Sequence, residues 1–267
     1  MLNLIFLAHA IVAVVFCPVS DPNVYKKKNE GVDLDLYQKI LCDLEDLNFQ
    51  GKILFSAFSE PMLHRGIYDL MKMTKDKLPL SRLEIVSNGD LIKTDRMKKL
   101  FDSGLDTVSL SLYDGPHQMT FFQGMMKELG LTDKQVVLRR RYKENGNWGM
   151  VISNRTGIVN SNLYRDENEE EVVTLPLKKN CFYPFYQMVI DYNGDVLLCA
   201  HDWKKKFVAG NVKNEHLWDI WRGKKYNFVR EKLHCSNRGF APCNTCDVKG
   251  DVMGRESYEH WKNLNEQ

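Results

Sequence analysis

Five of the seven cysteines lie in the last third of this 267-residue chain, and four of these five stand at spacings that could bind a metal ion or an iron–sulfur cluster. Cys243 and Cys246 form a Cys-x-x-Cys pair, which places two thiolates on one tight turn. Cys181 and Cys199 flank a predicted hairpin, and a hairpin returns its two ends to each other. Four such thiolates can close a Cys₄ site, which suits an iron–sulfur cluster or tetrahedral zinc. The spacing alone leaves both centres open.

Short local signals predict the elements around these cysteines. The runs 188–190 and 196–198 are apolar, and the intervening Asn193-Gly194 favours a type I′ turn because these residue types tolerate positive φ angles. Asn214 is the predicted N-cap of a short helix that runs to Trp221, and Gly223 is predicted to terminate it. We therefore expect the last third of the chain to form a hairpin followed by at least one helix.

The same segment resembles a SPASM or twitch-type domain, the auxiliary iron–sulfur domain of radical S-adenosylmethionine (SAM) enzymes. The similar stretches follow one another in order: Cys181–Phe185, Asp191–Cys199, Gly210–Val212, Leu217–Trp221 and Pro242–Asp247. With four candidate ligand cysteines rather than seven, the segment is most similar to the single-cluster, twitch-like form. The resemblance favours iron–sulfur over zinc, and it implies an auxiliary [4Fe–4S] cluster held by Cys181, Cys199, Cys243 and Cys246.

The first half of the chain alternates between short apolar runs and amphipathic stretches. Helices are predicted near 67–71 and from Thr94, and strands at 52–58, 83–86, 107–112 and 135–138. Strands repeating at this interval are typical of βαβ units, which build a parallel sheet with helices outside it. The acidic stretch 165–171 is a solvated connection.

The predicted strand ends resemble those of the partial (β/α)₆ barrel of radical SAM enzymes. Phe55–Pro61 is similar to the family's Gly-Gly-Glu segment, and Val86–Asp90 and Ser111–Pro116 are similar to the segments that end the next two strands. All three fall where barrel strands run into loops, the edge on which barrel enzymes assemble their sites. The resemblance implies that SAM binds there, with its amino group at Ser59 and Glu60, and that the site includes Ser87, Asn88 and Ser111.

Two arginines are further candidates for this site. Arg139 and Arg141 alternate on one face of a predicted strand. An inward arginine at that position could pair with the SAM carboxylate. A solvated strand end explains the two side chains equally well, so both interpretations stay open.

The loop after the first predicted strand departs from the family pattern. Radical SAM enzymes hold the SAM-cleaving cluster with Cys-x-x-x-Cys-x-x-Cys in this loop, and Phe16-Cys17-Pro18 resembles the end of that motif. Ala10 and Val14 stand at the other two positions, and neither side chain can ligate iron. The chain is therefore either a degenerate member of the family, or its first sixteen residues do not represent the functional N-terminus.

Taken together, these patterns predict an α/β fold with a partial (β/α)₆ TIM-like barrel and a small α+β cluster-binding domain. The barrel is expected over residues 1–160, an acidic linker over 161–176, and the cluster-binding domain over 177–267. The apolar run 1–16 is predicted to be a buried first strand rather than a targeting segment, because it lacks a basic n-region. It is also shorter than the ~20 residues that a membrane-spanning helix needs.

Charge and cysteine usage limit the partners and the compartment. Lys and Arg number 37 and Asp and Glu 35, so no overall field attracts nucleic acid or an anionic membrane. An odd number of cysteines, gathered near one end, fits metal ligation in a reducing compartment better than a disulfide framework, which predicts a cytoplasmic protein. Cys42 is expected in the core, and Cys235 has no context that suggests a role.

The resemblance implies an enzyme that splits SAM to a 5′-deoxyadenosyl radical and abstracts hydrogen from a substrate carbon. The substrate would be a sugar, an aminocyclitol or a peptide, with dehydrogenation, epimerisation or maturation as the outcome, and the electron donor a protein such as flavodoxin or ferredoxin. No catalytic residue is assigned. Two alternatives remain: a non-catalytic relative that binds one iron–sulfur cluster, and a zinc-binding structural module.

Overall fold

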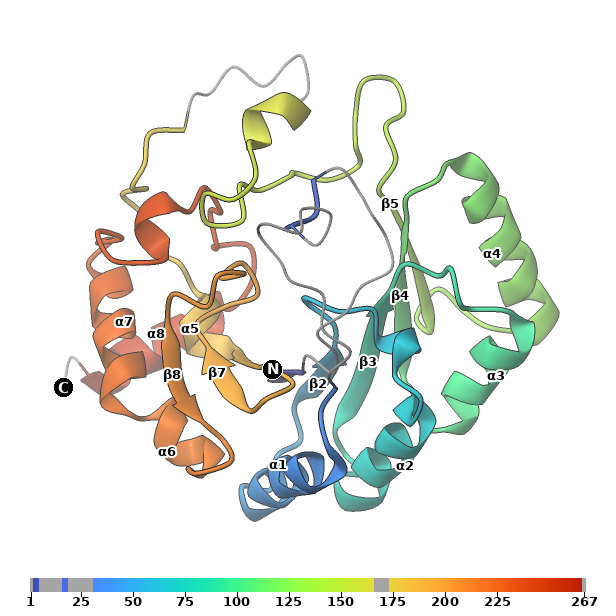
Figure 1. The fold of residues 1–267 in the computed structure, drawn as a ribbon, viewed down its shortest axis with the longest axis horizontal. Helices are drawn as coiled ribbons and strands as arrows, with labels where there is room; N and C mark the ends of the chain where they lie inside the picture. The colour runs from blue at the N-terminus through green and yellow to red at the C-terminus, as the bar shows by residue number, and fades with distance from the viewer. Residues whose placement is uncertain (1, 5–15, 19–30, 166–172, 266–267) are drawn as a thin grey trace.

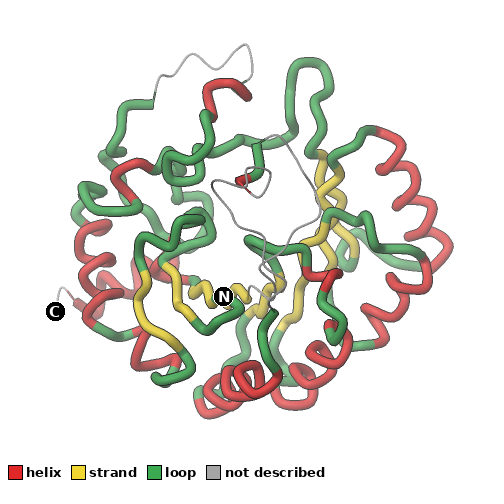
Figure 2. Tube along the Cα trace, viewed as in Figure 1, coloured by secondary structure: helices red, strands yellow, loops and turns green. Residues whose placement is uncertain are grey.

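A computed structural model describes residues 2–4, 16–18, 31–165 and 173–265, and its first half consists of parallel strands alternating with helices (Figure 1). The strands are β1 (Leu2–Leu4), β2 (Lys52–Phe55), β3 (Arg82–Ser87), β4 (Thr107–Leu112) and β5 (Val136–Arg140). The helices are α1 (Leu34–Asp46), α2 (Ile67–Lys77), α3 (Thr94–Asp102) and α4 (Pro116–Leu129). Figure 2 shows these helices outside the curved sheet, as expected for βαβ units.

The second half continues the same sheet and adds helices at its far end. Three further strands are β6 (Met188–Ile190), β7 (Asp195–Leu197) and β8 (Val208–Asn211). The α-helices are α5 (Tyr183–Tyr186), α6 (Leu217–Trp221), α7 (Lys224–His234) and α8 (Arg255–Asn265). Short 3₁₀ helices lie at η2 (Pro61–Leu63), η3 (Ser161–Tyr164) and η4 (Cys243–Thr245).

The described strands form one sheet in the order β5-β4-β3-β2-β1-β6-β7-β8. Strand β1 is parallel to both of its neighbours, β2 and β6, whereas β6, β7 and β8 pair antiparallel. The parallel strand beyond β1 thus comes from the C-terminal part of the chain and not from a sixth βα unit of the barrel. The predicted fold class, a partial barrel joined to a small α+β part, is confirmed.

Apolar side chains explain why these residues form these elements. All six residues of β4 are buried, as expected for a parallel strand that is covered on both faces. Helix α1 begins where the Asp33 side chain accepts a hydrogen bond from the Leu36 N–H at 2.7 Å. A separate apolar cluster, Phe182, Phe185, Leu198, Val229, Leu233 and Tyr258, holds α5, α7 and α8 together beside the hairpin. The main core runs along the barrel strands and includes Met188, Ile190 and Val196 of β6 and β7, so one core lies under both parts of the sheet.

Three local predictions were wrong. Only Gly194 of the β6–β7 turn has a positive φ angle, 90°, so the turn is not of type I′, which needs two such residues. Helix α6 ends at Trp221 as predicted, but its N-cap is His216 rather than Asn214, and Gly223 is the N-cap of α7. Cys42 is exposed because it lies on the outer face of α1.

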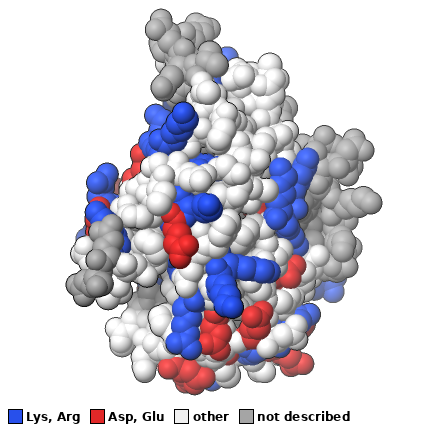
Figure 3. Space-filling model, turned by 90° about the vertical axis from the view of Figure 1, so that its left-hand side faces the viewer, with Lys and Arg blue, Asp and Glu red and all other residues white. Residues whose placement is uncertain are grey.

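The charge distribution on the surface and the length of the helices concern two possible partners, nucleic acid and a membrane. Figure 3 shows basic and acidic side chains interspersed on the face that it presents. Within the part of the chain that the structure describes, no helix is long and apolar enough to span a bilayer. The apolar run 1–16 contributes β1, and its residues 5–15 lie outside the described residues.

Candidate cofactor and substrate site

The carboxyl ends of β2, β3 and β4 surround a cavity of about 120 Å³. Its described lining is Phe16, Cys17, Ser59, Glu60, Val86, Ser87, Asn88, Ser111, Tyr113 and Arg155. The strand-end residues predicted from the sequence therefore meet in one place. They meet because parallel strands present their carboxyl ends on the same edge of the sheet.

Glu60 is the buried carboxylate of this cavity, with 4% of its surface exposed. Its Oε1 accepts hydrogen bonds from the Met62 N–H at 3.1 Å and the Ser87 hydroxyl at 2.8 Å, and its Oε2 accepts one from the Asn88 N–H at 2.9 Å. Burial raises the pKa of Glu60, and these hydrogen bonds oppose that rise. A cationic group from a ligand would replace the hydration that Glu60 has lost.

Ser59 supplies a second indication of a ligand in the cavity. Its Oγ atom is buried and makes no hydrogen bond to the described residues. Buried polar atoms in native proteins nearly always have a partner, so an orphaned hydroxyl on a cavity wall indicates a bound group or a water molecule. The polar wall of Ser59, Ser87 and Asn88, with the Glu60 carboxylate at its centre, fits the amino acid moiety of SAM.

Arg155 is a residue of the cavity that sequence reasoning missed. Its Nε atom is buried and makes no hydrogen bond to the described residues, and its backbone has a φ angle of 48°. Burial lowers the pKa of Arg155, and the nearby Cys17 raises it. No local sequence motif predicts a role for Arg155. This residue belongs to the irregular segment after β5 and reaches the cavity only through tertiary packing.

Arg139 and Arg141 do not contribute to the described lining of the cavity. The Arg141 Nη1 atom donates to the Gly149 carbonyl at 3.1 Å. Burial lowers the pKa of Arg141, and the phenol of Tyr113 opposes that change, so this arginine lies close to a lining residue without reaching the cavity. The prediction that one of the two arginines binds the SAM carboxylate stays a prediction.

Cys17 lines the cavity, as the motif match predicts. Ala10 and Val14 lie outside the described residues, and no cysteine precedes Cys17 in the sequence. Three thiolates hold a SAM-cleaving cluster in the family motif, whereas this loop supplies one. The residues of this chain therefore do not fit that first cluster.

The four C-terminal cysteines surround a second, smaller cavity of about 20 Å³. Its lining includes Cys181 before α5, Cys199 after β7, and Cys243 and Cys246 at the two ends of η4. Among the described residues, no three His, Cys, Asp or Glu side chains lie close enough to hold a single metal ion. The hairpin and the Cys-x-x-Cys turn nevertheless place the four cysteines that the sequence selected around one cavity.

Burial and the charges of neighbouring cysteines shift the pKa values of these four thiols. Burial raises the pKa of Cys181, Cys199 and Cys243, and it raises the pKa of Cys246 to about 11. The negative charge of Cys246 adds to the rise at Cys199, and that of Cys181 adds to the rise at Cys243. The raised pKa values keep the four groups protonated in the absence of a metal, and a metal centre that binds them would favour their thiolate form. A [4Fe–4S] cluster takes four thiolates, so this donor set fits the cluster.

One aromatic pair lies between the two cavities. The rings of His201 and Tyr183 both line the cysteine cavity and stack, with centroids 5.7 Å apart and an interplanar angle of 4°. His201 Nδ1 also lies 3.2 Å from the Arg155 Nη1 atom. Burial, followed by the charge of Arg155, lowers the pKa of His201 to about 3, so the neutral ring can accept this hydrogen bond. Arg155 and His201 thus connect the two cavities directly.

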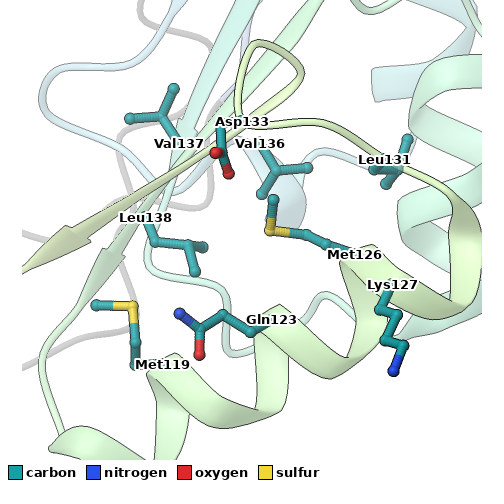
Figure 4. Close-up of a pocket in the computed structure, with 9 residues that line it drawn as sticks. All are labelled: Met119, Gln123, Met126, Lys127, Leu131, Asp133, Val136, Val137 and Leu138. Carbon is teal, nitrogen blue, oxygen red and sulfur yellow. The ribbon is translucent and has the colours of Figure 1, made fainter.

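A larger groove of about 530 Å³ lies elsewhere, between α4 and β5 (Figure 4). It is lined by Met119, Gln123, Met126, Lys127, Leu131, Asp133, Val136, Val137 and Leu138. None of the candidate site residues contributes to it. Its size alone does not make it the site, because no buried carboxylate or group of thiols faces it.

Comparison with known proteins agrees with this geometry. Residues 181–247 match the model of the SPASM iron–sulfur cluster-binding domain. The chain is 29% identical over 249 residues to the S-adenosyl-L-methionine-dependent 2-deoxy-scyllo-inosamine dehydrogenase of Niallia circulans, covering 92% of this chain and 91% of that protein. It is 21% identical to the tungsten-containing aldehyde ferredoxin oxidoreductase cofactor-modifying protein of Pyrococcus furiosus, over 92% of this chain and 88% of that protein.

Solved structures of other proteins also superpose on this chain. The structure of BtrN in complex with AdoMet and 2-DOIA superposes with a TM-score of 0.78 at 25% identity, covering 96% of each chain. Native anSMEcpe with bound AdoMet superposes with a TM-score of 0.56 at 14% identity, covering 100% of this chain and 96% of that one, which shows a shared fold. The domain match supports iron–sulfur rather than zinc as the occupant of the cysteine cavity.

Proposed function

We propose that this chain, which belongs to the radical SAM enzymes that carry a C-terminal SPASM iron–sulfur domain, derives from a dehydrogenase of a small polyhydroxylated amine or alcohol. The observation that carries the proposal is the juxtaposition of the two cavities through Arg155 and His201. A substrate held beside Arg155 would lie between a SAM site and an electron-accepting cluster. The similarity to a 2-deoxy-scyllo-inosamine dehydrogenase over nine-tenths of the chain supports an aminocyclitol-like substrate rather than a peptide.

Each group of residues has a distinct part in this proposal. Glu60 binds the SAM ammonium group, because it is a buried carboxylate at the cavity wall. The hydroxyl of Ser59 and the polar groups of Ser87, Asn88 and Ser111 orient the rest of that moiety. Arg155 binds a hydroxyl or an anionic group of the substrate, because its guanidinium is the basic group of the described lining.

The cysteine cavity would hold the auxiliary [4Fe–4S] cluster. When bound, that cluster supplies a nearby centre that accepts an electron during substrate oxidation. Cys181, Cys199, Cys243 and Cys246 fix its position, and their apolar surroundings exclude water from it. An external donor such as flavodoxin or ferredoxin completes the electron transfer, and the free thiols of these four cysteines suit the reducing cytoplasm.

Because Cys17 stands alone, the chain as given should bind SAM without cleaving it at a meaningful rate. The test is a double variant, Ala10→Cys with Val14→Cys, which restores the family's cysteine spacing ahead of Cys17. After anaerobic reconstitution and reduction, the variant should hold a second cluster and release 5′-deoxyadenosine from SAM. The unmodified chain is the control and should release none.

Two results would contradict this proposal in different ways. Release of 5′-deoxyadenosine by the unmodified chain would show that unidentified ligands complete the first cluster. A double variant that gains no second cluster would instead favour a non-catalytic relative that binds a single cluster. The missing cysteines make this relative the second candidate.

A further inference from the structure

The segment 153–161 forms a wall shared by the two cavities. Arg155 lines the SAM cavity, whereas Thr156, the next residue, lines the cysteine cavity. The segment has no regular secondary structure between β5 and η3, so hydrogen bonds to other parts of the chain must determine its shape. Those bonds lead to the loop that carries Cys243 and Cys246 and to His201, two residues after Cys199.

Asp247, directly after the last cysteine, holds the start of the segment. The Asn154 N–H donates to Asp247 Oδ1 at 2.9 Å and to Oδ2 at 2.8 Å, and the Ser161 hydroxyl donates to Oδ2 at 2.9 Å. One carboxylate thus bridges two points of the segment that are seven positions apart. Hydrogen bonds to an ionised acceptor are the stronger kind.

Thr245, between the two cysteines, holds the middle of the segment. Its hydroxyl donates to the Thr156 carbonyl at 2.8 Å, and its own carbonyl accepts from the Asn154 side-chain amide at 2.8 Å. A Cβ added to Gly157 would lie 3.2 Å from the Thr245 Cβ, so the Thr245 side chain packs closely against Gly157. Hydrogen bonds and packing therefore both join the Cys-x-x-Cys turn to the segment.

A second attachment runs from the segment to the other side of the cysteine cavity. His201, two residues after Cys199, lies with its Nδ1 atom 3.2 Å from Arg155 Nη1 and 3.3 Å from the Ser153 hydroxyl. The Thr156 hydroxyl donates to the His201 carbonyl at 3.3 Å. The guanidinium of Arg155 is thus aimed by a residue that is anchored next to a cluster ligand.

The backbone of the segment is left-handed at three consecutive residues, a conformation that contacts with other parts of the chain must stabilise. Arg155, Thr156 and Gly157 have φ angles of 48°, 57° and 87°. Left-handed backbone is unfavourable for the first two residue types, and it persists only where surrounding contacts impose it. Without its bonds to Asp247, Thr245 and His201, the segment would relax and Arg155 would leave the SAM cavity.

We propose that Thr245, Asp247 and His201 are positioning residues, through which the cluster-binding loops set Arg155 in the SAM and substrate cavity. Ligation of a cluster fixes Cys199, Cys243 and Cys246 and hence the three residues beside them, so loading the cluster also forms the Arg155 side of the cavity. This inference rests on the proposed function, because it requires the four cysteines to bind a cluster.

Backbone amide exchange tests the inference without any measurement of turnover. The N–H groups of Gly157, Ile158 and Val159 all donate to the Asn154 carbonyl, at 3.0, 2.8 and 2.9 Å, and so report opening of the segment. In the full chain, their exchange should slow by about tenfold or more when the cluster is reconstituted, since charged hydrogen bonds are worth at least that factor. Amides of β4, far from the cysteines, should not change.

A pair of variants separates positioning from folding. Thr245→Val keeps the shape of the side chain and removes its hydroxyl, whereas Thr245→Ser keeps the hydroxyl. In loaded protein with normal iron content, Thr245→Val should exchange about tenfold faster at 157–159, and Thr245→Ser should match the unmodified chain. Asp247→Asn should also exchange faster, whereas Asp251→Asn, whose carboxylate pairs with Lys179 at 2.6 Å, should have no effect.

These experiments distinguish a failure of the positioning inference from a failure of the cluster assignment. Iron-loaded protein in which residues 157–159 exchange as fast as in metal-free protein would overturn this inference and leave the cluster assignment intact. Equal exchange in the Val and Ser variants at position 245 would also overturn it. A chain that binds no iron would instead refute the proposed function from which the inference starts.

Discussion

At the scale of single residues, Glu60 shows how burial and hydrogen bonding combine in a binding site. Its carboxylate lies among the ends of three strands and accepts three hydrogen bonds, yet burial still raises its pKa. A carboxylate in this condition gains more from a ligand cation than an exposed one would. The sequence predicted this role for Glu60 only through the resemblance of Phe55–Pro61 to the Gly-Gly-Glu segment of radical SAM enzymes.

Glu60→Gln should reveal this pKa through the stability of the free protein. A raised pKa in the folded state stabilises the fold below the unfolded pKa, near 4.5, and that contribution is lost as pH rises through the folded pKa. The Gln side chain does not titrate. Relative to the unmodified chain, the variant should therefore become more stable between pH 4.5 and pH 7, as measured by denaturant unfolding. A stability difference that does not change with pH would contradict the raised pKa.

Gly250 shows how closely the backbone approaches a proposed cluster ligand. Its φ angle is 74°, its carbonyl accepts from the Phe182 N–H at 2.7 Å, and an added Cβ would overlap the Cys181 sulfur. Only glycine fits here without displacing the thiol.

Gly250→Ala should therefore lose most of its cluster, measured as iron and sulfide per chain. The matched control is Gly130→Ala, where φ is also positive, at 65°, but an added Cβ would meet nothing within 4 Å. The Gly130→Ala control introduces the same backbone strain of about 1–2 kcal/mol and should keep its cluster. Equal iron content in the two variants would contradict the assigned position of Cys181.

At the scale of elements, the predictable features were those with local causes. The strands β2 to β5 and the helices α2 and α3 follow from apolar periodicity, and the β6–β7 hairpin follows from two apolar runs around a turn. The pairing of β1 with β6 could not be predicted, because it joins residues far apart in sequence. The Arg155 segment was missed for the same reason, since its shape depends on Thr245 and Asp247 and not on its own residues.

One helix contact joins the barrel to the C-terminal part. Asp43 on α1 is 6% exposed and accepts a hydrogen bond from the Leu217 N–H, the first residue of α6, at 3.0 Å. Lys39 donates to the same carboxylate at 2.9 Å. The first N–H groups of a helix have no partner within it, so Asp43 satisfies one that would otherwise be buried and unpaired.

Asp43→Ala should lower the free energy of unfolding by about 2 kcal/mol, because it leaves the buried Leu217 N–H without an acceptor. The control is Asp46→Ala on the same helix, whose carboxylate is 73% exposed and lies 3.9 Å from His216. This control should cost less than about 0.5 kcal/mol. Denaturant titration measures both variants, and equal losses would show that α1 and α6 are not joined through Asp43.

At the scale of the whole molecule, one continuous sheet places the two cofactor cavities next to each other. The order β5-β4-β3-β2-β1-β6-β7-β8 carries the SAM cavity on its parallel half, and the cysteines lie beyond its antiparallel end. The chain therefore combines four cysteines around one cavity with a loop after β1 that has a single cysteine. The domain match and the shared cavity both indicate a cluster at these four cysteines.

Iron and acid-labile sulfide analysis of anaerobically purified protein tests that site most directly. The unmodified chain should be brown and contain about four irons and four sulfides, the complement of one [4Fe–4S] cluster. The variant Cys243→Ala with Cys246→Ala should contain neither, and its C-terminal part should be less stable because ligation contributes to folding. Stoichiometric zinc without sulfide in the unmodified chain, or full iron content in the double variant, would contradict the account.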